Sequence, residues 1–218
     1  MSEELAAAVA AVRARIEAAA RRAGRDPEEV RLVGACKTVP AERLVAALDA
    51  GLRDLGENRA QELLAKAPVL AEHASPPTWH FVGRLQRNKV AALAPWVSLW
   101  QSVDRVSLGE AIARRAPGAR VLIEVNLGEE VQKAGCAPAQ TASLLDSLRG
   151  LGLRVEGLMT VAPQVGDARR WFATLRGLGE GLAVAELSMG MTGDFEEAVE
   201  EGATIVRVGR AIFGERPR

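Results

Sequence analysis

The chain has 218 residues, 48% of them apolar, and its 28 basic and 28 acidic side chains cancel. One large buried core is therefore possible. The chain has no net charge that would attract nucleic acid or an anionic membrane. Its two cysteines and two histidines fit neither a zinc site nor a disulfide framework. No run of 18 apolar residues and no secretory signal pattern occurs, so we expect a cytoplasmic protein that holds no metal and enters no membrane.

The first predicted element is an amphipathic helix within residues 1–24. Apolar residues recur with helical spacing from Leu5 to Ile16, Ser2 is the predicted N-cap, and Gly24 is the predicted stop. We expect this helix to pack on the outside of the domain that follows.

After Asp26 the pattern changes to short apolar runs separated by longer helical stretches, as in βα units. The predicted strands are Arg31–Lys37, Leu52–Asn58, Thr78–Gly83, Trp96–Val103, Arg120–Leu127, Leu153–Val161, Ala183–Gly190 and Thr204–Phe213. The predicted helices between them are Ala41–Ala50, Arg59–Leu70, Arg87–Leu93, Arg105–Ala116, Pro138–Leu148, Asp167–Leu178 and Phe195–Glu201.

Strict alternation of eight strands with helices predicts the α/β class and a single (β/α)8 TIM barrel over residues 1–218, with the extra N-terminal helix. An open doubly wound sheet is the alternative topology. In a barrel, functional residues lie at the C-terminal ends of the strands.

The first strand ends in Lys37, and period-two alternation places Val33, Ala35 and Lys37 on one face. Burial of a lysine on the barrel interior lowers its pKa, and the neutral amine can then form an imine with a carbonyl compound. The alternative is an interior ion pair with Glu57 or Glu124.

Glycine-containing loops follow the seventh and eighth strands, where barrels frequently bind phosphate. The segment 186–194 offers peptide N–H groups and the hydroxyls of Ser188 and Thr192, although the same residues would also start an ordinary capped helix. Arg207 and Gly209 share a face of the eighth strand, which is adjacent to the first in a closed barrel. A lysine that forms imines beside a phosphate site suggests a ligand with both an aldehyde and a phosphate, and pyridoxal phosphate fits.

Two more polar residues lie at predicted strand ends. Asn58 and His80 could orient the ring of such a ligand, but a helix N-cap and a hydrogen-bonded buried histidine explain them equally well. The basic residues Arg84, Arg87 and Lys89 are either a solvated helix start or a surface for a protein partner.

Six ordered motifs across nearly the whole chain resemble the YggS-type pyridoxal phosphate homeostasis proteins, which are relatives of the alanine racemase N-terminal barrel domain. The motifs are Cys36–Thr38, Gly56–Glu62, His80–Lys89, Gly157–Thr160, Ser188–Asp194 and Arg207–Gly214.

The resemblance implies a Schiff base on Lys37 and Arg207 facing the pyridine nitrogen. It also implies further cofactor contacts from Asn58, His80, Met159, Ser188, Met191, Thr192, Gly209 and Arg210. Two departures are present: Thr192 replaces the usual serine, and Arg210 stands where serine or threonine is expected, which puts its phosphate contact in doubt.

The resemblance implies a carrier of the cofactor with no established catalytic residues, a monomer that serves pyridoxal-phosphate-dependent apo-enzymes. A racemase would need an acid and a base on opposite faces of the cofactor, and related racemases supply a tyrosine from a second domain. The chain contains no tyrosine, and we expect no second domain after the eight strands. A Schiff-base aldolase acting on a sugar phosphate is the third hypothesis, with Glu57 or Glu124 as its acid or base.

Overall fold

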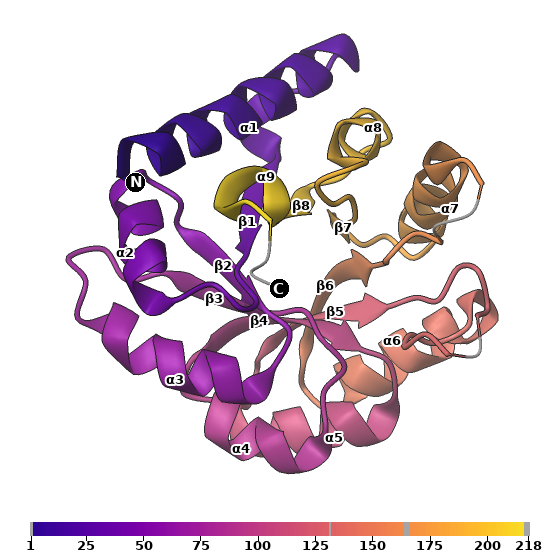
Figure 1. The fold of residues 1–218 in the computed structure, drawn as a ribbon. Coiled ribbons are helices and arrows are strands. Elements are labelled where there is room, and N and C mark those ends of the chain that lie inside the picture. The colour runs from indigo at the N-terminus through magenta and orange to yellow at the C-terminus, as the bar shows by residue number, and fades with distance from the viewer. Residues whose placement is uncertain (1, 131, 164–165, 216–218) are drawn as a thin grey trace.

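The computed structural model of the chain describes residues 2–130, 132–163 and 166–215. Its strands form a closed parallel barrel in which each strand pairs with the next and β8 pairs back with β1 (Figure 1). The strands are β1 (Arg31–Ala35), β2 (Asp54–Glu57), β3 (Thr78–Phe81), β4 (Val97–Val103), β5 (Arg120–Glu124), β6 (Arg154–Met159), β7 (Glu186–Ser188) and β8 (Ile205–Val208). The predicted barrel is therefore confirmed.

Helices surround the barrel (Figure 1). The α-helices are α1 (Ser2–Arg22), α2 (Ala41–Asp49), α3 (Ala60–Ala71), α4 (Val90–Leu93), α5 (Val106–Arg115), α6 (Thr141–Gly150), α7 (Ala168–Gly181), α8 (Phe195–Glu200) and α9 (Arg210–Phe213). Short 3-10 helices are η1 (Pro27–Glu29), η2 (Arg87–Lys89) and η3 (Pro138–Gln140). The extra helix α1 lies outside the ring and contacts α2, α8 and α9.

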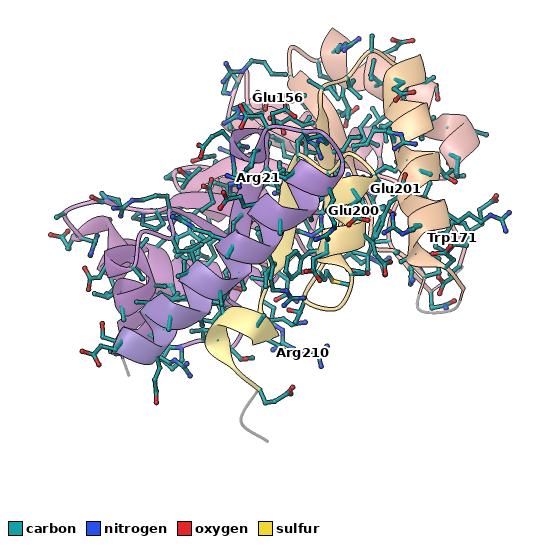
Figure 2. All side chains as sticks on the ribbon, turned by 90° about the horizontal axis from the view of Figure 1, so that it is seen from above. Arg21, Glu156, Trp171, Glu200, Glu201 and Arg210 are labelled. Atoms are coloured by element: carbon teal, nitrogen blue, oxygen red, sulfur yellow. The ribbon has the colours of Figure 1, made fainter. Side chains whose placement is uncertain are left out.

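Acidic side chains of α8 connect α1 to α7. Glu200 accepts from Arg22 of α1 and from Arg169 of α7, and Glu201 lies 3.0 Å from Arg176 Nη1 of α7. Figure 2 shows both carboxylates between the two helices. These ion pairs fix α1 against the barrel at the side where β7 and β8 close it.

The structure corrects three predicted boundaries. Arg210–Phe213 is the helix α9 and not part of the eighth strand, because the chain turns at Gly209, whose carbonyl accepts from the N–H groups of Ile212 and Phe213. Ser2 is the first residue of α1 and not its N-cap. The predicted helix Arg87–Leu93 is divided into η2 and the single turn of α4.

The apolar side chains form two separate layers. Most of them lie between the sheet and the helices, whereas a small cluster fills the barrel interior and consists of Val33, Leu99, Leu122, Met159 and Ile205. Polar side chains occupy the rest of the interior, and they lie on the same faces of their strands as these apolar ones.

Candidate functional site

Lys37 lies in the turn that follows β1, at the C-terminal face of the barrel. The strand ends at Ala35, two residues earlier than predicted, and the lysine is half-buried. The next residue, Thr38, has φ 64°, a left-handed conformation that a β-branched residue rarely adopts. Other contacts must therefore hold this turn in place.

Those contacts come from α3. Lys66 Nζ donates to the carbonyl of Cys36 over 2.9 Å, and Glu62 Oε2 accepts from the N–H of Thr38 over 2.6 Å. These two groups belong to the peptide bonds immediately before and after Lys37. Lys66 also bonds Glu62 over 3.0 Å and Glu57. We call Lys66 and Glu62, which hold the peptide groups on both sides of Lys37, the clamp, and the buried ammonium group of Lys66 connects its parts.

The two carboxylates considered as interior partners of Lys37 lie on different faces of the sheet. Glu57 shares the outer face of β2 with Leu55 and bonds Lys66, and its burial raises its pKa while Lys66 opposes the rise. Glu124 shares the interior face of β5 with Leu122. Glu57 is therefore part of the support under the Lys37 turn, and Glu124 is an interior acid.

Glu124 is 9% exposed, and burial, followed by the negative charge of Asp104, raises its pKa to about 7. The positive charges of Arg207 and Arg84 oppose the rise. A carboxyl group that changes charge near neutral pH thus lies inside the barrel, and the positive charge of Arg207 affects its pKa.

Arg207 on β8 is 4% exposed and is held at both of its terminal nitrogens. Nη1 donates to Ser188 Oγ over 2.6 Å, and Nη2 donates to the carbonyl of Thr160 over 2.7 Å. Burial lowers the pKa of Arg207 to about 10, against the opposing charges of Glu124 and Asp194, so the guanidinium remains a cation at neutral pH. Its orientation is fixed before any ligand arrives.

The hydrogen bonds continue from Ser188 across the barrel. Ser188 Oγ donates to Gln101 Oε1 over 2.6 Å, Gln101 Nε2 and His80 Nδ1 are 2.7 Å apart, and His80 Nε2 and Asp54 Oδ1 are 2.9 Å apart. Arginine can only donate, so Ser188 Oγ accepts from Arg207 and gives its own proton to Gln101 Oε1. Gln101 Nε2 then donates to His80 Nδ1, so the proton of His80 is on Nε2 and is donated to Asp54. Burial lowers the pKa of His80 although Asp54 opposes this, consistent with a neutral ring.

This chain of hydrogen bonds gives two predicted cofactor contacts another role. Both ring nitrogens of His80 are used and the residue is 1% exposed, so it does not face a ligand at the barrel mouth. The hydroxyl proton of Ser188 points to Gln101 and is not available to a phosphate. Sequence reasoning missed Gln101, although a glutamine inside a buried strand is an unusual signal.

The loop after β7 turns at Gly190, where φ is +89°. Its Met191 N–H, a predicted phosphate contact, donates to Asp194 Oδ1 over 2.6 Å instead. The Gly209 N–H lies 3.4 Å from Thr192 Oγ1. In the described chain, the N–H groups of Thr192, Gly193 and Arg210 donate to no protein group.

The side chain of Arg210 does not converge on this loop. It is exposed and lies 3.8 Å from Glu215 at its closest approach, and Figure 2 shows it at the outside of the molecule. Only the backbone of Arg210 therefore remains as a phosphate contact. The arginine that replaces the expected serine or threonine brings no side-chain hydroxyl to this loop.

Asn58 follows β2, and its buried Oδ1 has no hydrogen-bond partner among the described residues. The residue is tightly packed, because a Cβ on Gly83 would lie 2.2 Å from the Asn58 carbonyl oxygen. Met159, fully buried, belongs to the interior apolar cluster. An unsatisfied amide oxygen is the kind of group that a polar ligand would complete.

Two classes of site find no support in the part of the chain that the structure describes. No group of three or more histidine, cysteine or acidic side chains is arranged to hold a metal ion there. None of its helices has the length and apolar character needed to cross a membrane.

Comparisons with known proteins show the family and the fold of the chain. Residues 8–217 match the family described as alanine racemase, N-terminal domain. Pyridoxal phosphate homeostasis proteins from Aquifex aeolicus and Escherichia coli (strain K12) are 44% and 35% identical, covering 93% and 98% of this chain and 94% and 97% of theirs. The solved structure of PipY from Synechococcus elongatus PCC7942 with PLP bound is 32% identical, with a TM-score of 0.84, over 96% of this chain and 100% of that one.

Proposed function

Because the chain belongs to the family of the pyridoxal phosphate homeostasis proteins, we propose that it binds pyridoxal 5'-phosphate through Lys37 and acts in intracellular homeostasis of this cofactor. One observation carries the proposal. Closure of the barrel pairs β8 with β1 so tightly that a Cβ on Gly209 would lie 3.1 Å from the Ala35 carbonyl oxygen. The turn that carries Lys37 and the loop after β8, which begins at Gly209, are thus neighbours.

The residues present fit the cofactor. It needs an amine for its aldehyde, a partner for its ring nitrogen and donors for its phosphate. We assign these to Lys37, to Arg207 and to the loop N–H groups of Thr192, Gly209 and Arg210. The unsatisfied Asn58 Oδ1 fits a polar part of the ring, whereas Met159 is fully buried in the interior apolar cluster and supports the site from below its surface. We leave His80 and Ser188 out of the direct contacts, and Met191 enters only if its N–H leaves Asp194.

Pyridoxal phosphate supplies an aldehyde that condenses reversibly with amines and a ring that can withdraw electrons. The expected effect of Arg207 on that ring favours a carrier over an enzyme. A cation held by Ser188 and Thr160 cannot accept a proton, so it keeps a facing ring nitrogen unprotonated and weakens electron withdrawal. The contacts of Lys66 and Glu62 meanwhile hold the backbone on both sides of Lys37, from which its amine extends for repeated bonding and release.

We therefore propose a carrier without efficient catalysis, acting as a cytoplasmic monomer that serves pyridoxal-phosphate-dependent apo-enzymes. Racemase chemistry would need a second acid opposite the lysine, and the chain has no tyrosine to supply it. For an aldolase, the outward-facing Glu57 is unsuitable, which leaves Glu124 as the available interior acid.

The test is the visible absorption spectrum after incubation with pyridoxal phosphate. Wild type and the control Lys89→Ala, which changes a lysine outside the site, should acquire the same visible band, and Lys37→Ala should not. Transfer of the cofactor is then followed by mixing the loaded protein with an apo-enzyme and recording the appearance of its activity. A wild type that stays colourless but forms a borohydride-trapped adduct with a sugar phosphate would replace the carrier with the aldolase.

A further inference from the structure

A second surface of the molecule collects positive charge that the protein itself does not neutralise. Most cationic side chains of the described residues have an ion pair, a hydrogen bond or a ring contact. Those without any are Arg43, Arg84, Arg87, Lys89, Arg114, Arg115 and Arg149. Five of these seven belong to two short segments, residues 84–89 and 114–115. Arg87, Arg114 and Arg115 line one hollow, whereas the charge of Arg84 acts on the interior Glu124.

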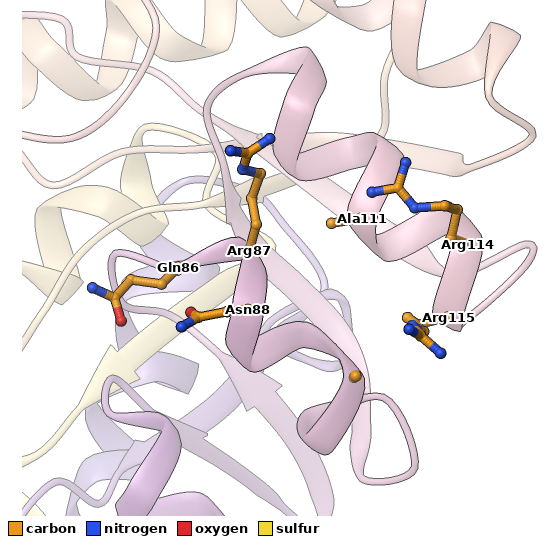
Figure 3. Close-up of a pocket in the computed structure, with 7 residues that line it drawn as sticks. Gln86, Arg87, Asn88, Ala111, Arg114 and Arg115 are labelled. Atoms are coloured by element: carbon orange, nitrogen blue, oxygen red, sulfur yellow. The ribbon is translucent and has the colours of Figure 1, made fainter.

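The two segments face each other across a hollow on the outside of the barrel. Its volume is about 530 Å³, and we call it the basic groove. Arg87 stands on one side and Arg114 with Arg115 on the other, with Ala111 between them (Figure 3). Ala91 and Ala111 are the two alanines that line the hollow. Gln86 and Asn88 add amide groups beside Arg87.

The groove exists because the ring of helices is thin at this point. The helix that should cover β3 and β4 is α4, which has only four residues, whereas α3 has 12 and α5 has 10. The rest of that connection is η2 and the loop before it. The short α4 therefore leaves a hollow beside α5, where Ala111 is 5% exposed.

The loop that leads to Arg87 has a well-held backbone. Ser102 Oγ donates to the Gly83 carbonyl over 2.6 Å, and Arg105 Nη2 donates to the Leu85 carbonyl over 2.9 Å. Leu85 itself is 3% exposed and anchors the loop in the core. A held backbone reduces the conformational entropy that this segment loses on binding, although its arginine side chains must still become ordered.

We propose that the basic groove is a docking site for an acidic, extended segment of a protein partner. Its cations are spread along two walls and do not converge on one point, which suits several carboxylates on one chain better than a single phosphate. Its two alanines accept small apolar side chains between them. No aromatic side chain lines the hollow, so stacked bases of a nucleic acid have no platform.

The site does not depend on cofactor binding at Lys37, and the loop 83–86 that leads into it begins where β3 ends at the barrel mouth. A partner seated here would therefore lie beside the opening of the barrel. The absence of a net charge on the chain means that attraction to an acidic partner must come from this local cluster.

The experiment measures fluorescence anisotropy of a dye-labelled 12-residue peptide of alternating glutamate and alanine, titrated with the full chain at two salt concentrations. Arg87→Glu/Arg114→Glu should weaken binding by at least about tenfold, and added salt should weaken wild-type binding. Arg43→Glu/Arg149→Glu is the matched control, because it changes the net charge equally at exposed, unpaired arginines elsewhere, and it should retain wild-type binding.

Cofactor absorbance is recorded for each variant, and an unchanged band shows that the fold and the Lys37 site are intact. Equal losses in the two double variants, or no peptide binding by wild type, would overturn the proposal. The proposal would also be overturned if tripolyphosphate, or a single-stranded oligonucleotide of equal charge, bound more tightly than the peptide and Arg87→Glu/Arg114→Glu abolished that binding.

Discussion

Arg207 Nη1 and Ser188 Oγ are 2.6 Å apart inside the barrel, and this contact turns the serine hydroxyl away from the phosphate loop toward Gln101. Because both partners are buried, the bond sets the orientation of the cation and not merely its presence.

Gln101 is the middle of the chain that holds Arg207. Gln101→Leu would leave the Ser188 hydroxyl proton without an acceptor and His80 Nδ1 without a donor. We expect a loss of about 1–3 kcal/mol in the free energy of unfolding. The visible band of the cofactor complex should also shift, because Arg207 loses its fixed orientation. Urea unfolding and absorption spectra check this beside Gln61→Leu, an exposed glutamine of α3; a normal band in Gln101→Leu would show that the chain does not position Arg207.

Lys66 supports the turn that carries Lys37. Lys66→Met would leave Glu57 as an unpaired buried carboxylate and release the Cys36 carbonyl, at a cost of about 3–5 kcal/mol. The double variant Lys66→Met/Glu57→Gln should recover part of this stability but not the cofactor affinity, since the carbonyl remains unheld. Chemical denaturation and cofactor titration of both variants separate the two effects, and full recovery of affinity in the double variant would contradict the positioning role.

Glu124 should make stability depend on pH. Its pKa of about 7 in the folded protein lies above the ordinary 4.5, so the folded state binds more protons than the unfolded state between these values. Stability therefore falls as pH rises from 4.5 to 7, by up to about 3 kcal/mol for this group. Glu124→Gln should remove this part of the pH dependence and be more stable than wild type above pH 7, as measured by unfolding without added cofactor.

Glu42→Gln, at an exposed position of α2, is the control and should leave the pH profile unchanged. A Glu124→Gln profile that parallels wild type across the window would mean that the carboxyl group is not the buried acid described above.

Two glycines of one loop should respond differently to the same change. Gly190→Ala places a side chain on a residue with φ +89° and puts its Cβ 2.5 Å from Ala198 Cβ, so we expect about 2–4 kcal/mol of destabilisation. A Cβ on Gly193 meets nothing within 4 Å, and Gly193→Ala should change stability little. Thermal unfolding of the pair provides the comparison; similar midpoints for both would show that the loop can relax around Gly190.

The sequence alone determined the architecture, because eight short apolar runs alternating with helices leave few ways to bury a sheet on both faces. Residue parity placed Lys37 and Arg207 on interior faces, and the order of the motifs identified the family. The sequence did not predict that the eighth strand ends before Gly209, because the apolar residues Ala211–Phe213 suit a buried strand as well as a buried turn of helix.

Only the tertiary structure decided what each polar residue contacts. Glu57 and Glu124 were equal candidates until the sheet placed one against Lys66 and the other inside the barrel. Cys36 and Lys66, or Gln101 and Ser188, are 30 and 87 residues apart in sequence, and no local pattern predicts such a bond. Hydrogen bonds depend on distance and direction within tenths of an ångström, and closure of the barrel is what sets both.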